Sequence, residues 1–179
     1  MRTVVLFGFL LFAGCSSVTT LSPLPADVDT PELETFAGTW QFENEVVHVA
    51  LREEGVACVA SLAWDDSAFV TKQGELTVTH GEHRSFFCLA AFDAEIPSDE
   101  FLFFQYRFLS PDELIVWQPR IESFQNAVDN GQLGAADGST NGHLVLDVES
   151  AALLAFIDDP ARSDLFEYED PMVLRRSLR

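Results

Sequence analysis

Apolar and polar residues alternate with a period of two along much of the chain, which is typical of half-buried β-strands. The clearest case is Val47, Val49 and Leu51, which alternate with more polar positions. Gln73-Gly74 predicts a turn within the region 69–79, and Pro111 predicts a hairpin turn after 109. The strands expected on this pattern, all antiparallel to their neighbours, are 47–51, 56–64, 69–71, 76–79, 86–89, 101–109 and 114–117.

The run 101–109 carries the strongest strand pattern. Its even-numbered residues, Leu102 to Phe108, are all apolar or aromatic, whereas the odd-numbered face turns polar at Gln105 and Arg107. Because successive side chains of a strand point to opposite faces, the even-numbered face is predicted to face the core.

The period changes after Pro119. Apolar residues recur at helical spacing over 121–128, and a second short helix is expected from Ser150 to about Asp158, with further short strands at 144–146 and 172–174. The predicted fold is therefore mainly β. About eight short antiparallel strands form a small barrel or sandwich, with two short helices inserted in the C-terminal part.

Residues 1–14 have the pattern of a signal peptide, in which Arg2 precedes an uncharged apolar stretch that ends in small residues. That stretch is too short for a transmembrane helix, which needs about 20 residues. Residues 12–15 read Phe-Ala-Gly-Cys and resemble the bacterial lipobox, with Phe12 where leucine is commonest. The resemblance implies cleavage before Cys15, a lipid on the Cys15 thiol and anchoring in a membrane. The alternative is an ordinary secretory signal followed by a chance cysteine.

The residues after the cysteine predict how the chain is organised. Ser16 resembles the residue found at this place in outer-membrane lipoproteins, which implies a location in the cell envelope, at the outer membrane and facing the periplasm. Residues 15–35 are rich in proline, serine and threonine and are predicted to be the lipidated cysteine and a flexible tether. Residues 36–179 are expected to form one domain.

The triplet Gly38-Thr39-Trp40 resembles the Gly-x-Trp that opens lipocalins and their relatives, the calycins. The resemblance implies a calycin-like barrel in which Trp40 closes one end. The layout is also similar to that of uncharacterised bacterial envelope lipoproteins with the same hairpin, helix and acidic-apolar tail, and this similarity implies no activity.

The formal net charge is −19, and Lys72 is the only lysine. Such a surface repels nucleic acid and anionic headgroups, so nucleic acid is excluded as a partner. The lipid, and not a basic patch, is then expected to hold the protein at the membrane. Adaptation to a salty habitat is the other reading of this acidity.

The chain offers few residues for chemistry. His80 and His83 flank Glu82 in a predicted turn, and His48 or His143 would have to supply a third ligand, since zinc takes three or four. Turns collect polar residues in any case, so no metal and no cofactor is expected. The adjacent carboxylate pairs are interpreted as a turn, at Asp65-Asp66, and as a helix stop, at Asp158-Asp159.

Cys58 and Cys88 lie in apolar strands and are expected to be two buried free thiols, although an exported protein could join them in a disulfide. Neither a Gly-x-Ser-x-Gly elbow nor a glycine-rich nucleotide loop occurs, so no catalytic residue is predicted.

These observations favour a non-catalytic envelope lipoprotein that acts as a structural or interaction module. Its partners are then the membrane, through the lipid, and either an envelope protein or an apolar small molecule. The alternative is a calycin-like carrier of a small apolar ligand, since the sixteen phenylalanines either fill the core or line a cavity. A third alternative is an unrecognised enzyme. A filled barrel interior would favour the first function, and an open cavity the second.

Overall fold

The computed structural model describes residues 17–26, 31–52, 56–65, 68–90, 99–137, 139–140 and 142–177. The expected signal peptide and Cys15 lie outside this part of the chain. Its elements are, in order, β1 (Ser17–Thr20), α1 (Pro31–Phe36), β2 (Gly38–Phe42), β3 (Glu45–Leu51), β4 (Ala57–Asp65), β5 (Ala68–His80), β6 (Ser85–Ala90), β7 (Phe101–Ser110), β8 (Glu113–Trp117), α2 (Ile121–Asp129), β9 (His143–Leu146), α3 (Ser150–Asp158) and β10 (Met172–Arg176).

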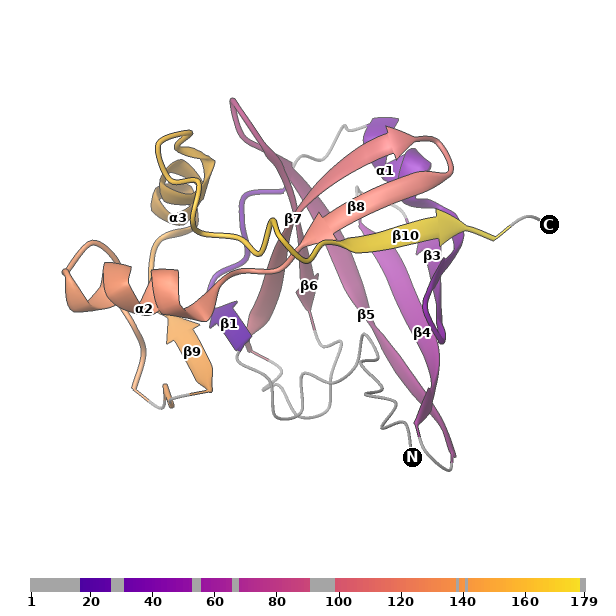
Figure 1. Cartoon of the computed structure of the whole chain (residues 1–179), viewed down its shortest axis with the longest axis horizontal. Helices are drawn as coiled ribbons and strands as arrows, with labels where there is room; N and C mark the ends of the chain where they lie inside the picture. The colour runs from indigo at the N-terminus through magenta and orange to yellow at the C-terminus, as the bar shows by residue number, and fades with distance from the viewer. Residues whose placement is uncertain are drawn as a thin grey trace.

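Eight antiparallel strands close into a barrel in the order β2-β3-β4-β5-β6-β7-β8-β10, with β10 returning to β2 (Figure 1). The mainly β prediction is confirmed, and of its two forms the structure adopts the small calycin-like barrel. The even-numbered residues of β7 face the barrel core, as the alternation predicted, and Arg107 is exposed.

One strand prediction is wrong. Residues 69–71 and 76–79 belong to a single thirteen-residue strand, β5, which runs through Gln73-Gly74 without a turn. Gly74 pairs with Val59 of β4 in an unbroken register. Gly74 therefore lies in the interior of a strand and not in a turn.

The expected tether is wrong for the residues that the structure describes. Val18 and Leu24 are buried, and β1 pairs with β7 on one side and, in parallel, with β9 on the other. β1 occupies the stretch of β7 that lies beyond its pairing with β8, where an unpaired strand edge would otherwise remain. Farther along the same segment, α1 was also not predicted.

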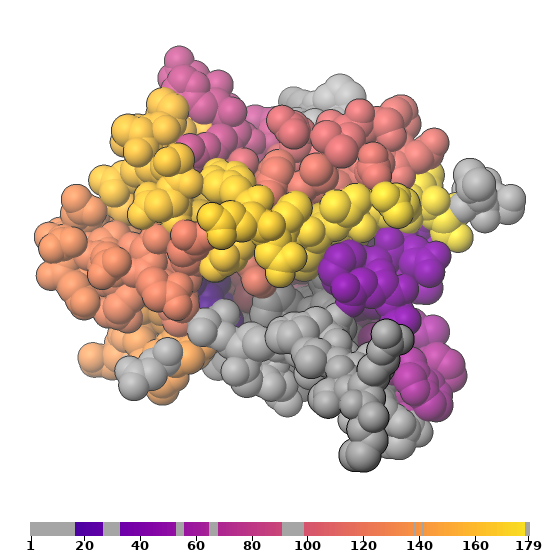
Figure 2. Space-filling model, viewed as in Figure 1, coloured from indigo at the N-terminus to yellow at the C-terminus, as the bar shows by residue number. Residues whose placement is uncertain are grey.

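A second lobe packs against the outer face of β6 and β7. Figure 1 shows α2, α3 and β9 gathered beside the barrel, and Figure 2 shows the C-terminal segment crossing from this lobe to the barrel in a continuous band. Both predicted helices are confirmed. The buried residues of the lobe include Phe86, Phe103, Phe124, Leu153 and Phe166. None of the described helices is both long enough and apolar enough to cross a membrane.

Arg176 closes the barrel at the end where α1 lies. Its guanidinium donates to the backbone oxygens of Thr35, at 2.7 Å, Ala37, at 2.6 Å, and Pro111, at 3.0 Å. It also lies over the ring of Trp40, with 4.3 Å between the guanidinium carbon and the ring centroid. One side chain therefore joins α1, β2 and the β7–β8 turn.

We predict that Arg176→Ala lowers the free energy of unfolding by about 3 kcal/mol or more, because three charge-assisted hydrogen bonds and a cation–π contact are lost together. Arg176→Lys should lose most of the same stability, since an ammonium cannot bridge three carbonyls in one plane. Urea unfolding measures both.

Arg175 is the matched control, since its side chain is 75% exposed and its ion pair is with Glu113 at the surface. Arg175→Ala should cost under about 1 kcal/mol. Equal losses at Arg175 and Arg176 would contradict the closing role of Arg176.

Candidate functional site

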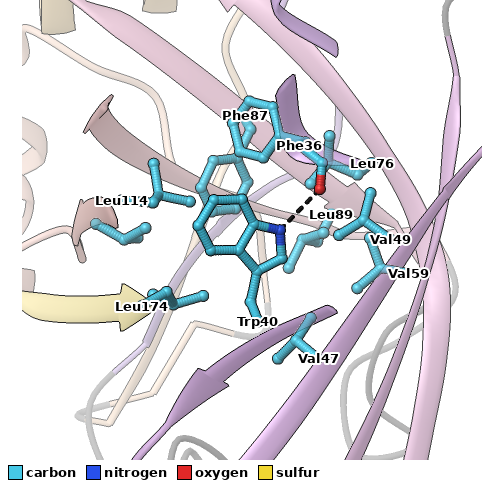
Figure 3. Close-up of a pocket in the computed structure, with 11 residues that line it drawn as sticks. Phe36, Trp40, Val47, Val49, Val59, Leu76, Phe87, Leu89, Leu114 and Leu174 are labelled. Atoms are coloured by element: carbon cyan, nitrogen blue, oxygen red, sulfur yellow. Dashed lines mark hydrogen bonds between the residues drawn. The ribbon is translucent and has the colours of Figure 1, made fainter. Parts of the chain in front are cut away.

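The barrel interior is filled by its own side chains. Trp40 is 1% exposed, and its indole N–H donates to the backbone oxygen of Phe36 at 2.8 Å, so that the ring lies among the other apolar side chains of the interior (Figure 3). The cavity that remains has a volume of about 40 Å³. Ligand pockets usually measure about 300–1,000 Å³. The lining is wholly apolar and includes Val47, Val59, Leu76, Phe87, Leu114 and Leu174.

A polar group lies inside the barrel toward the opposite end. Glu45 is 1% exposed and Ser61 3% exposed. Lys72 pairs directly with Ser61 in the register, so their side chains share a face. Neither carboxyl oxygen of Glu45 makes a hydrogen bond to a described residue. Burial raises the pKa of Glu45 to about 7, and the neighbouring Ser61 hydroxyl and Lys72 ammonium offset only part of this rise.

The outer wall of the barrel carries a group of exposed apolar side chains that we call the outer apolar face: Val46 of β3, Leu62 and Trp64 of β4, and Phe69 of β5. Val46 pairs with Leu62 and Trp64 with Phe69, so the four form two neighbouring cross-strand pairs. The rings of Trp64 and Phe69 meet edge to face, with centroids 4.8 Å apart, and Phe69 is 66% exposed. A groove of about 450 Å³ runs beside Val46 and Leu62.

The histidines are dispersed. The described residues contain no group of three or more His, Cys, Asp or Glu side chains arranged to hold a metal. His48 bonds to Thr39, His80 lies 3.4 Å from the Tyr106 hydroxyl, and His83 is exposed. His143, considered as a third ligand, belongs to a different network beside β1.

That network joins three segments far apart in the sequence. His143 Nδ1 lies 2.7 Å from the Ser17 hydroxyl and its Nε2 lies 2.9 Å from Glu100 Oε2. The Thr19 hydroxyl donates to the same Glu100 oxygen, and the Ser17 amide donates to the backbone oxygen of Gly142. Serine, histidine and a carboxylate are also the groups of a hydrolase triad. Here, however, the hydrogen bonds of Ser17, His143 and Glu100 join β1 to β9. We interpret the network as a structural clamp.

The predicted helix stop at Asp158 is confirmed, but the residue has a second role. Asp158 is 7% exposed, and its carboxylate accepts the backbone N–H groups of Glu82, His83 and Arg84, three successive residues of the β5–β6 turn. A side chain at Gly81 would collide with this carboxylate. Of the other predicted pair, Asp65 ends β4, and Asp66 lies outside the described residues.

The two domain cysteines are free thiols, as expected, but only Cys88 is buried. The Leu24 amide donates to its sulfur at 3.4 Å, and burial raises the pKa of Cys88 to about 12. Such a thiol stays protonated and behaves as a small apolar side chain. Cys58 is half-buried on the outer wall.

Comparison with known proteins adds no relative, since no family model, curated protein or solved structure matches this chain.

We predict that Glu45 makes stability fall as the pH rises. Its pKa is raised from 4.5 to about 7, so the folded state holds a proton that the unfolded state has released. The penalty therefore begins near pH 4.5, grows toward pH 7 and is complete above it, reaching about 3 kcal/mol at about 1.4 kcal/mol per unit. Glu45→Gln should remove it, so that wild type loses up to about 3 kcal/mol relative to this variant between pH 5 and pH 8.

Chemical denaturation across that pH range measures the difference. Glu75→Gln changes an exposed acid on the outer side of β5 and should follow the wild-type curve to within about 0.5 kcal/mol. Parallel curves for wild type and Glu45→Gln would contradict the prediction.

Proposed function

We propose that this protein is a lipid-anchored interaction module of the cell envelope, which presents its outer apolar face to another envelope protein and performs no catalysis. The observation that carries the proposal is the filled barrel interior. A 40 Å³ cavity is too small for a lipid or similar ligand, so the small-molecule carrier is the less favoured function.

The outer apolar face supports a protein partner. Scattered single apolar residues are normal on a protein surface, but Val46, Leu62, Trp64 and Phe69 are adjacent and include two aromatic rings. Aromatic side chains are enriched where proteins bind each other. The residues that line the neighbouring groove include His48 but no carboxylate, although the chain as a whole has a net charge of −19. A mostly apolar partner that packs into this groove would therefore bury no carboxylate there.

The fold also bears on how the anchor would work. Cys15 is two residues from Ser17, the first residue of β1. Two residues span at most about 7 Å, so a lipid on Cys15 would hold the folded body directly at the membrane and not on a long tether. In that position, the outer apolar face can reach only partners that lie in or near the same membrane.

The anchor is tested by replacing Cys15. We expect Cys15→Ser to move the protein from the membrane fraction to the soluble fraction of the cell envelope, because no acyl chain remains to bind the bilayer. Detergent partitioning and fractionation of cells measure this. Unchanged membrane association would show that the anchor is wrong while leaving the outer apolar face to be judged by its own test.

The outer apolar face is tested by placing a photoreactive phenylalanine analogue at position 69. Illumination of cells should crosslink it to one discrete envelope protein, and Trp64→Ser should lower the yield at least fivefold, since it removes the ring that packs on position 69.

Leu109 is the matched control position, because it is also apolar and 49% exposed but lies on β7. The analogue at position 109 should give no such product. Equal crosslinking from both positions, or none from position 69, would overturn the proposed interaction surface.

A further inference from the structure

A second groove, of about 360 Å³, lies where the β5–β6 turn meets β7 and β8, away from the outer apolar face. Arg84, Gln105, Arg107 and Trp117 line it, and Glu82 is the only carboxylate-bearing residue among the lining residues. We propose that this groove binds a small organic carboxylate, and that Arg107 pairs with the carboxylate group.

Arg107 differs from the other described arginines in its contacts. Of the seven arginines that the structure describes, the other six all donate to a carboxylate, an amide or a backbone oxygen. Arg107 makes no hydrogen bond or ion pair with a described residue; its contact is with the Trp117 ring, at 5.9 Å. The chain has a net charge of −19, so carboxylates greatly outnumber cations. An arginine in a groove that pairs with none of the described carboxylates is therefore able to bind an external anion.

Gln105 and Trp117 lie beside Arg107 in the groove. Gln105 and Arg107 are two residues apart on β7 and share its outer face, where Gln105 pairs with Trp117 of β8. The oxygen of the Gln105 amide accepts from the Tyr168 hydroxyl at 2.6 Å, which leaves the amide nitrogen as the group that can donate to a ligand. Arg107, Gln105 and Trp117 thus line one groove.

The same turn already binds a carboxylate from within the chain. The amides of Glu82, His83 and Arg84 are all taken by Asp158, and Arg84 donates to the backbone oxygens of Ile157 and Arg162. These contacts fix the rim of the groove and occupy its backbone donors. Recognition of an external anion therefore falls to Arg107, with Gln105 beside it.

Charge and size select the class of ligand. The planar fork of a guanidinium matches a carboxylate through two parallel hydrogen bonds. A polyanion or a dianionic phosphate would suffer more repulsion from a protein of net charge −19 than a ligand with a single charge. A volume of about 360 Å³ suits a small molecule, and the Trp117 ring offers an apolar surface to the rest of it.

The test uses benzoate as the probe and the full chain at low ionic strength, followed by nitrogen–proton correlation NMR. Benzoate should cause saturable shifts of the Arg107 side-chain N–H and the Trp117 indole N–H. Benzyl alcohol, which has the ring without the charge, should cause none, and phenyl phosphate should bind more weakly than benzoate.

Arg107→Gln should weaken benzoate binding at least tenfold, while Arg52→Gln should leave it unchanged. Arg52 is exposed like Arg107, although it pairs with Glu75, and it lies just after β3, outside the groove. Its replacement therefore makes the same change in net charge away from the proposed site. The NMR spectrum shows in the same experiment that each variant is folded.

Four results would overturn the proposal. Absence of saturable shifts would show that the groove takes no carboxylate. Equal losses in the two variants would mean that benzoate responds only to net charge. Equal binding of benzyl alcohol would mean that the ring alone is recognised, and tighter binding of phenyl phosphate would assign the groove to a different anion.

Discussion

The barrel depends on one seam, the pairing of β2 with β10, and on the Arg176 side chain that reinforces it. Only two register pairs join these strands, Gln41 with Arg175 and Trp40 with Arg176. They also bring together segments more than a hundred residues apart, which costs more loop-closure entropy than the hairpin pairings of the barrel. Arg176 compensates by bonding to three carbonyls and covering Trp40. Gly38 completes the seam, because a Cβ there would lie 2.5 Å from the guanidinium.

The wall formed by β6 and β7 serves two cores, and this explains the phenylalanine content better than a ligand cavity does. Each of these strands carries two consecutive phenylalanines, and neighbours on a strand point to opposite faces. Phe87 and Phe104 stack inside the barrel with centroids 5.1 Å apart. Their chain neighbours, Phe86 and Phe103, fill the second lobe, where each packs near Phe166. These four phenylalanine rings therefore fill the two cores by packing and do not line a ligand cavity.

Alternation was enough to predict most barrel strands and the inward face of β7, because one buried face imposes a period of two whatever the partner strand. Alternation does not reveal β1, whose four residues are too few to show a period and mostly carry hydroxyl groups. It also divided β5 at Gly74, where a local turn preference loses to pairing with β4 along its whole length. The Phe86-Phe87 doublet did hold a signal for a second core, since a half-exposed strand would not carry an aromatic ring on both faces. The contacts of Asp158 and His143 could not be predicted from local patterns, because they join residues 43 to 126 positions apart.

Three carboxyl groups are buried in the described part of the chain, and they show how an acidic protein with few cations stabilises acids in its interior. Asp158 is held by three backbone amides, and Glu100 by the Thr19 hydroxyl and the His143 imidazole, so neither uses an arginine. The Glu45 oxygens have no hydrogen-bond donor among the described residues, and burial raises the pKa of Glu45, which favours its protonated form. The described arginines other than Arg107 bind side chains at the surface or donate to backbone oxygens where segments meet. Because even the buried acids do without them, the position of Arg107, exposed over Trp117 and bonded to no described acid, cannot be explained by the needs of the fold.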